Sequence, residues 1–105
     1  MTLPKFGAFL GAIDKSARHY TTAKRGNFTT WEEYERLPAY ADGRNEGGWR
    51  IQVERYTSEE YDAIAEALEE AFEAADNIAV RDQLVDKDTD GENLTIRHLF
   101  DIEVW

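Results

Sequence analysis

The chain has 105 residues, of which 42% are hydrophobic and 32% charged, with a net charge of −10 and no cysteine. This length and composition predict one globular domain, residues 1–105, and argue against a disordered chain. The lack of cysteine excludes disulfides, thiolate catalysis and cysteine-bearing metal sites, and so acidic a chain is a poor general binder of phosphate backbones.

The charge is unevenly divided along the chain. Residues 1–50 hold eight basic and six acidic groups, a net charge of +2, whereas residues 51–105 hold four basic and sixteen acidic groups, a net charge of −12. Two interpretations stay open: the charge serves solubility, or copies associate head to tail, the basic part of one meeting the acidic part of the next.

The N-terminus predicts a helix over residues 3–17. Thr2 is available as N-cap, and Pro4 is tolerated in the first turn. The apolar positions recur at spacings of three and four, as on one helix face: Phe6, Phe9, Leu10, Ile13 and Ala17. The patch is too short to span a membrane, and Asp14 and Lys15 follow it without a cleavage pattern, so we expect a cytoplasmic protein with no membrane contact.

Residues 18–48 give a mixed pattern. Residues 20–22 suit a strand and residues 25–27 a turn. Trp31, Tyr34 and Leu37 are spaced three apart, which predicts a loop or one short helical turn over residues 31–37. A short strand is expected at residues 39–41. Residues 42–48 contain three glycines and no aliphatic residue, so they predict a turn or loop.

A strand that runs directly into a helix is the clearest feature of the sequence. Residues 49–56 alternate between apolar and polar side chains, which is typical of a strand. The helix is expected from Ser58 to Ala75, with Thr57 and Glu60 as a capping box and Tyr56 and Tyr61 as a hydrophobic staple. Its apolar stripe is Tyr61, Ile64, Ala65, Leu68, Ala71, Phe72 and Ala75.

The other side of this helix is acidic and holds no Lys or Arg. Its members are Asp62, Glu66, Glu69, Glu70 and Glu73. Three interpretations stay open for this face: a solvated surface, the lining of a channel that carries DNA without binding it, or a mimic of the DNA backbone.

The last third predicts a β-hairpin. Residues 78–84 form its first strand and residues 94–104 a long alternating second strand, with a turn over residues 86–93 in which Asp90-Gly91 is a tight-turn pair. The order of elements predicts an α+β fold, a small antiparallel or mixed sheet with two main helices on one face.

No metal, cofactor or catalytic site is predicted. Asp86, Asp88, Asp90 and Gly91 match the opening of a calcium loop, but Arg97 stands where the bidentate Glu is required. His19 and His98 have no second ligand at helical spacing, and His98 falls on the apolar face of its strand, as a hydrogen-bonded core or interface histidine would. No nucleophile with a base and an orienting acid is apparent, so we do not expect an enzyme.

The order of elements resembles the tail-completion or tail-terminator proteins of long-tailed bacteriophages. The likeness runs from about Leu3 to Trp105, and its core is made of four parts. They are Leu37-Pro38-Ala39-Tyr40-Ala41-Asp42-Gly43 before a polar loop, Trp49-Arg50-Ile51-Gln52-Val53-Glu54-Arg55-Tyr56-Thr57, the helix over residues 58–75 and the closing strand over residues 94–104. The chain departs from the family pattern in having Ala39 between Pro38 and Tyr40.

The resemblance implies a virion protein, assembled in the host cytoplasm, that forms a ring of six copies around a lumen through which DNA passes without specific binding. Such a ring contacts the tail-tube protein on one side and a head-completion or connector protein on the other. The candidate contact residues are Asp42, Arg44, Asn45, Trp49, Asp86, Asp88, Asp90 and Asn93. The alternative is a small acidic inhibitor, a DNA mimic or anti-defence protein that binds a basic host protein.

Overall fold

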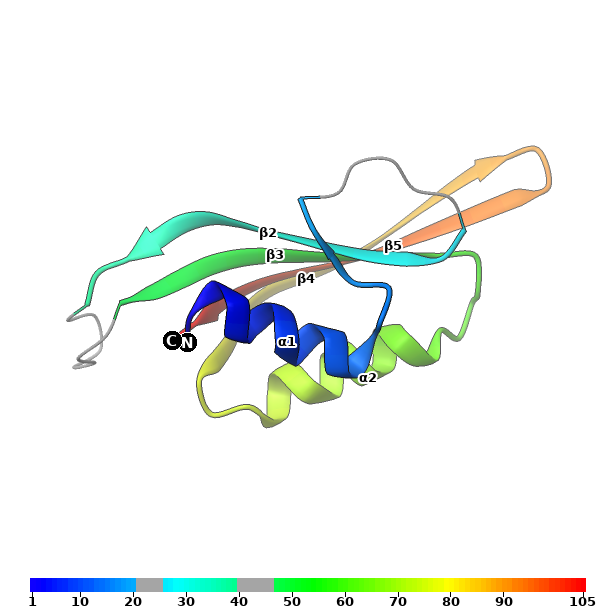
Figure 1. Cartoon of the computed structure of the whole chain (residues 1–105). Coiled ribbons are helices and arrows are strands. Elements are labelled where there is room, and N and C mark those ends of the chain that lie inside the picture. The colour runs from blue at the N-terminus through cyan, green and yellow to red at the C-terminus, as the bar shows by residue number, and fades with distance from the viewer. Residues whose placement is uncertain (21–25, 40–46) are drawn as a thin grey trace.

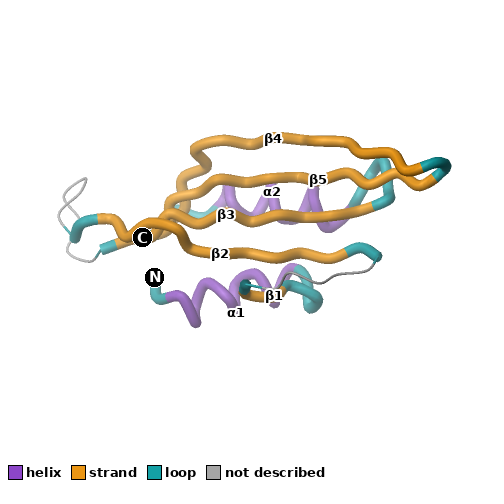
Figure 2. The backbone as a smooth tube through the Cα atoms, turned by 90° about the horizontal axis from the view of Figure 1, so that it is seen from above, coloured by secondary structure: helices purple, strands orange, loops and turns teal. Residues whose placement is uncertain are grey.

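The computed structural model describes residues 1–20, 26–39 and 47–105, and it confirms the α+β class. In chain order the elements are α1 (Leu3–Ile13), β1 (Arg18–His19), β2 (Phe28–Leu37), β3 (Gly48–Thr57), α2 (Ala63–Ala74), β4 (Ile78–Asp90) and β5 (Asn93–Val104). The strands form one five-stranded mixed sheet in the order β1-β2-β3-β5-β4. Both helices lie on the same face of this sheet, and β1 and β4 are its two edges (Figures 1 and 2).

Helix α1 begins as the sequence predicts and ends earlier. The Thr2 side chain accepts a hydrogen bond from the Lys5 amide at 3.3 Å, and Pro4 stands in the first turn. The helix ends at Ile13, because Asp14 is in extended conformation and its carboxylate binds the amide and hydroxyl of Ser16 instead.

Helix α2 begins at Ala63 rather than Ser58, so the predicted capping box and staple are wrong. Asp62 is the N-cap, and its carboxylate accepts from the Ala65 amide at 3.0 Å. The Thr57 hydroxyl accepts from the Glu59 amide in a local turn, while Tyr61 is 82% exposed and packs no staple. Asp62 displaces Thr57 as the cap because it also binds Arg55 of β3.

Residues 31–37 belong to strand β2, which corrects the predicted loop or helical turn. β2 pairs with β3 in antiparallel register from Phe28 to Leu37, with an irregularity between Glu33 and Glu35. At this irregularity Tyr34 is one extra residue in β2, so the alternation of side chains shifts by one position. The apolar residues Trp31, Tyr34 and Leu37 are therefore three apart, a spacing that resembles that of a helix. The predicted strand at residues 20–22 is instead β1 at Arg18–His19, and the described part of that segment, Tyr20, has a φ of 57°. Pro38 and Ala39 are not in a strand; residues 40–46 lie outside the described residues.

The C-terminal hairpin is confirmed and is longer than predicted. β4 and β5 pair from Ile78↔Val104 to Asp90↔Asn93, so most of the expected turn over residues 86–93 is strand. Only Gly91 and Glu92 form the turn, and Gly91 takes the positive φ of 63° that glycine tolerates without strain. The tip of the hairpin extends beyond the N-terminal end of α2 (Figure 1).

The core lies between the helices and one face of the sheet. Phe72 of α2 packs edge to face on Phe100 of β5 with ring centroids 5.3 Å apart, and Phe6 of α1 packs on Trp31 of β2 at 5.1 Å. Leu10, Ile51, Val53, Leu68, Ile102 and Val104 are fully buried around them. This burial is what holds the short α1 and α2 in place, since isolated helices of this length are marginal in water. Among the described residues, no helix has the length and apolar character needed to cross a membrane.

Candidate interaction surface

The face of the sheet opposite the helices carries a network of ion pairs. β3 contributes the alternate residues Arg50, Gln52, Glu54 and Tyr56, and β5 contributes Arg97, Leu99, Asp101 and Glu103. Arg50 lies 2.6 Å from Glu35 and 3.8 Å from Glu103. Arg97 lies 2.5 Å from Asp86 and 3.7 Å from Glu54. These pairs are solvent-accessible, so each stabilises the fold by at most about 1 kcal/mol, and the face is free to meet another molecule.

Two tyrosines are tied to carboxylates on the same face. The Tyr34 hydroxyl donates to Asp101 at 2.6 Å. Partial burial, followed by this hydrogen bond and the Asp101 charge, raises the pKa of Tyr34 to about 12. Tyr56 stacks on Phe28 with centroids 4.6 Å apart and donates to Glu54, and its pKa is raised by burial and by that carboxylate. Both hydroxyls therefore stay protonated donors at neutral pH.

One edge of the sheet is the long strand β4. Every residue from Ala79 to Asp90 is exposed, including the apolar Val80, Leu84 and Val85. The outer edge of a terminal strand presents backbone N–H and C=O groups to solvent and is a template for pairing with another chain. The aspartates at 82, 86, 88 and 90 charge this edge, and charged side chains are one way in which natural proteins protect an edge strand from indiscriminate pairing.

The other edge is β1, which carries a stacked cluster that the sequence did not reveal. The His19 ring lies between Tyr20 and Trp31, with centroid distances of 3.7 and 3.9 Å. His19 Nε2 is 2.7 Å from the Glu33 carboxylate, and the Tyr20 hydroxyl donates to the same carboxylate. These hydrogen bonds outweigh burial and lower the pKa of Glu33. The cluster fixes the conformation of the β1 edge, and only the parallel pairing of β1 with β2 brings its members together.

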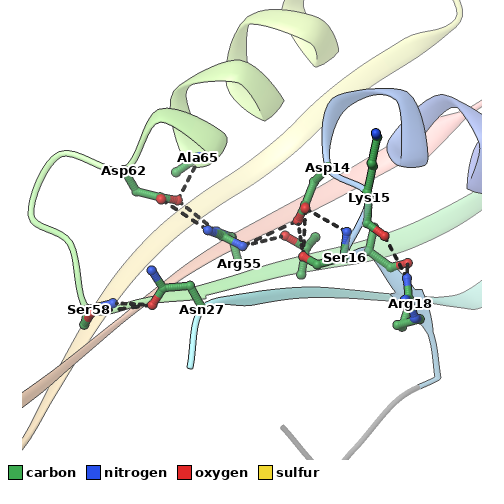
Figure 3. A network of polar contacts seen from close by, with 11 residues as sticks. Asp14, Lys15, Ser16, Arg18, Asn27, Arg55, Ser58, Asp62 and Ala65 are labelled. Atoms are coloured by element: carbon green, nitrogen blue, oxygen red, sulfur yellow. Dashed lines mark hydrogen bonds and ion pairs between the residues drawn. The ribbon is translucent and has the colours of Figure 1, made fainter. Parts of the chain in front are cut away.

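The helix-covered face holds a buried ionic network centred on Arg55 (Figure 3). Arg55 Nε donates to Asp62 at 2.8 Å, and its Nη1 donates to Asp14 and Thr29 at 3.4 and 3.5 Å. Asp14 follows α1 and Asp62 caps α2, so one guanidinium joins both helices to β2 and β3. The network has no access to a partner, and its role is structural.

Both carboxylates of this network have lowered pKa values. Burial opposes ionisation of Asp14, but hydrogen bonds from Thr29 and Ser16 and the charge of Arg55 hold its pKa below the ordinary value. Burial likewise opposes ionisation of Asp62, while Arg55, the Ala65 amide and nearby His98 hold its pKa down. Both groups are therefore ionised at neutral pH.

Asp62 is not part of an exposed acidic face, which corrects the prediction. It is 4% exposed because it faces Arg55 under the start of α2. Glu66, Glu70 and Glu73 are exposed on the outer side of α2, and Glu69 is half-buried. Within the described part of the chain, none of these four glutamates forms an ion pair.

The predicted contact residues that the structure describes lie in two separate places. Asp86, Asp88, Asp90 and Asn93 lie together on the outer half of the hairpin, in strands rather than in a loop. Trp49 lies in β3 beside a hollow at the start of α1, and the Arg36 guanidinium covers its ring at 4.4 Å. Asp42, Arg44 and Asn45 lie outside the described residues.

Asp86, Asp88 and Asp90 alternate along an extended strand, and Asp86 binds Arg97, so they do not converge as calcium-loop ligands do. Within residues 1–20, 26–39 and 47–105, no three His, Asp or Glu side chains are grouped to hold a metal ion. His98 stands on the helix-covered face as predicted, but its buried Nε2 has no hydrogen-bond partner among the described residues, contrary to the expectation.

No protein-family model matches the chain, and no curated protein sequence is significantly similar to it.

Proposed function

We propose that this protein is a structural subunit that closes the tail tube of a long-tailed bacteriophage and joins tail to head, as a ring of six copies. The observation that carries the proposal is edge strand β4, which is exposed from Ala79 to Asp90 and carries three exposed apolar side chains. An open edge strand is a template for pairing with another chain, and an assembling subunit can use it to bind a neighbour. The resemblance of the element order to tail-completion proteins supplies the class.

The uncovered sheet face suits contact with the other components of such a particle. Its arginines and carboxylates are paired within the chain but remain accessible to solvent. A tail-tube or head-completion protein can therefore bind there by replacing some of these ion pairs with pairs between the two proteins. The acidic surface as a whole repels DNA, which suits passage of DNA through a lumen without binding.

The mass of the protein tests this proposal. Native mass spectrometry of the purified chain over a range of concentrations should give a discrete oligomer that is a multiple of the 12.1 kDa subunit. Electron microscopy should show rings, and the protein should be present in purified virions of the phage that encodes it. A monomer under every condition, together with absence from virions, would rule the proposal out.

A second function, a small acidic inhibitor of a basic protein, is favoured by one observation. Glu66, Glu69, Glu70 and Glu73 of α2 have no ion pair in the described structure, unlike the carboxylates of the sheet face. Such a row of free charges suits a DNA mimic. It predicts a one-to-one complex with a nucleic-acid-binding protein, with an affinity that falls as salt rises. Substituting Glu70 and Glu73 by Gln should weaken that complex and leave ring formation unchanged.

A further inference from the structure

The two edges of the sheet carry opposite charge. On β4 and the following turn, five acidic residues are exposed, Asp82, Asp86, Asp88, Asp90 and Glu92. The exposed basic residues of β4 are Lys87 and Arg81, and Arg81 is paired with Glu103 at 3.3 Å. At the β1 edge, Lys15 and Arg18 are exposed, and the sequence has no acidic residue between Asp14 and Glu32. The Glu33 carboxylate reaches this edge, but its side chain is only 9% exposed and is bound by His19 and Tyr20. The outward charge is therefore positive at β1 and negative at β4.

The cations at the β1 edge are not neutralised within the chain. Arg18 Nη1 donates to the carbonyls of Lys15 and Ala17, at 2.9 and 3.0 Å. These contacts hold the guanidinium in place without cancelling its charge. Neither Lys15 nor Arg18 forms an ion pair with the residues that the structure describes.

The opposite charges lie at the same level along the strands. Arg18 pairs with Thr30, Thr30 with Glu54, Glu54 with Leu99, and Leu99 with Leu84. Arg18 and Leu84 are thus the two ends of one row across the whole sheet, and Figure 2 shows β1 and β4 as its opposite margins. Asp82 and Asp86 flank Leu84 on β4. A neighbouring copy placed side by side, without a shift along the strands, brings Arg18 to this acidic stretch.

The strand directions also fit such a neighbour. β1 is parallel to β2, and each following neighbour in the sheet is antiparallel to the last, so β4 runs opposite to β1. A second copy in the same orientation therefore presents its β1 antiparallel to the first copy's β4, which is the commoner and slightly more stable pairing.

A symmetric pairing of two β4 strands is disfavoured by their charges. In a two-fold antiparallel pair, residues at equal distances from the centre lie opposite each other. Every register centred on a residue from Leu84 to Asp90 then sets aspartate against aspartate, for example Asp82 against Asp86 when Leu84 is central. Like charges directly opposite are destabilising, so the edge selects a different surface as its partner.

We infer that copies of this chain join head to tail, with the β4 edge of one copy, around Asp82–Asp88, against the α1–β1 edge of the next, around Lys15 and Arg18. This inference rests on the self-assembly in the proposed function and assigns the surfaces that perform it. A head-to-tail contact repeats from copy to copy, and it closes into a ring when the rotation between neighbours allows.

Charge reversal at each edge tests the inference. Asp82→Lys with Asp88→Lys reverses the β4 edge at two aspartates that form no ion pair in the described structure, and Lys15→Glu with Arg18→Glu reverses the β1 edge. Each double variant should weaken self-association at least about tenfold, because like charges then face each other. The matched control for the β4 variant, Glu70→Lys with Glu73→Lys, raises the net charge by the same amount on the outer side of α2 and should assemble as the original chain does.

Restoration of assembly gives the decisive readout. An equimolar mixture of the two double variants should form complexes through the edges that each retains. The chain carrying all four changes should assemble again, since its edges are complementary in the opposite sense. Circular dichroism identifies any variant that fails to fold. If the chain with all four changes does not fold, the mixture of the two double variants still tests the inference.

The outcomes separate this inference from the proposed function. An original chain that assembles, while both edge variants assemble equally well, overturns the edge assignment and leaves the ring intact. The same holds if the four-site chain is folded but stays monomeric and the mixture forms no complex. An original chain that never assembles, alone or in particles, overturns the proposed function itself.

Discussion

Strand β3 carries two arginines on opposite faces of the sheet, and they have the same number of carboxylate partners but differ in how deeply they are buried. Arg50 on the open face and Arg55 under the helices each lie near two carboxylates. The Arg50 side chain is 28% exposed and that of Arg55 6%. Water solvates the first charge if its partners are removed, but the second has no such alternative. Burial, rather than the number of ion pairs, decides which arginine the fold depends on.

The difference also separates structure from interaction. The Arg55 network fixes the ends of both helices and cannot be reached from outside, while the Arg50 and Arg97 pairs can exchange partners with another molecule. Because side chains alternate between the two faces of a strand, one face of the sheet packs against the helices while the other remains accessible to solvent.

The largest expected effect is that of removing Arg55. Arg55→Ala leaves Asp14 and Asp62 buried without their cation and should lower the free energy of unfolding by about 3–5 kcal/mol. Arg50→Ala is the matched control and should lower it by at most about 1 kcal/mol. Urea unfolding followed by circular dichroism measures both, and equal losses for the two variants would contradict the comparison.

The same network predicts instability in acid. The folded-state pKa values of Asp14 and Asp62 are lowered from the ordinary value of 3.8. Their contribution is fully present above the unfolded-state pKa, and it is lost as the pH falls from about 4 through the lower folded-state values. Urea midpoints measured from pH 6 to pH 2 should fall steeply below pH 4. In Asp14→Asn part of this slope should disappear, while Glu35→Gln on the open face should keep it.

A smaller effect is expected at the hairpin turn. Gly91 has a φ of 63°, and a Cβ added there meets no atom within 4 Å. Gly91→Ala should therefore cost only the left-handed backbone penalty of about 1–2 kcal/mol, and Gly91→Asn should cost less because Asn tolerates this region. Thermal unfolding of the two variants measures the difference. Equal stability of Gly91→Ala and the original chain would show that the turn relaxes.

The smallest effect concerns Tyr34 on the open face. Its pKa of about 12 depends on partial burial and on Asp101. Asp101→Asn removes the carboxylate charge and should bring the Tyr34 pKa down toward 10, seen as phenolate absorbance appearing at lower pH. Tyr34→Phe identifies the band that belongs to this residue. An unchanged titration in Asp101→Asn would show that the hydrogen bond does not form in solution.

Regular alternation and helical spacing predicted the elements that obey one period throughout. The stripe of α1, strand β3 and the inner face of α2 follow from local spacing, and each is present in the structure. Strand β2 was missed because the irregularity near Glu33 breaks its alternation. The outer half of β4 was missed because aspartate and threonine favour turns locally, whereas pairing with the long β5 keeps them extended.

The candidate surface was predicted only in part for a similar reason. The acidic hairpin could be recognised from its sequence, and Glu66, Glu70 and Glu73 are exposed as expected. The burial of Asp62 could not be predicted from the sequence, because its partner Arg55 is a strand residue that faces the core only in the folded chain. The sequence also could not predict that Arg18 and Leu84 lie at the two ends of one row across the sheet, because this depends on four pairings between strands distant in sequence.

Cross-linking between single introduced cysteines tests the head-to-tail assembly most directly, since the natural chain has none. Arg18→Cys and Leu84→Cys place one thiol at each end of the same cross-sheet row. The two variants, mixed and treated with a short thiol cross-linker, should give covalent dimers of the mixed kind, and neither variant alone should cross-link efficiently. Efficient cross-linking of Leu84→Cys with itself, or oligomers that contain no mixed product, would contradict the account.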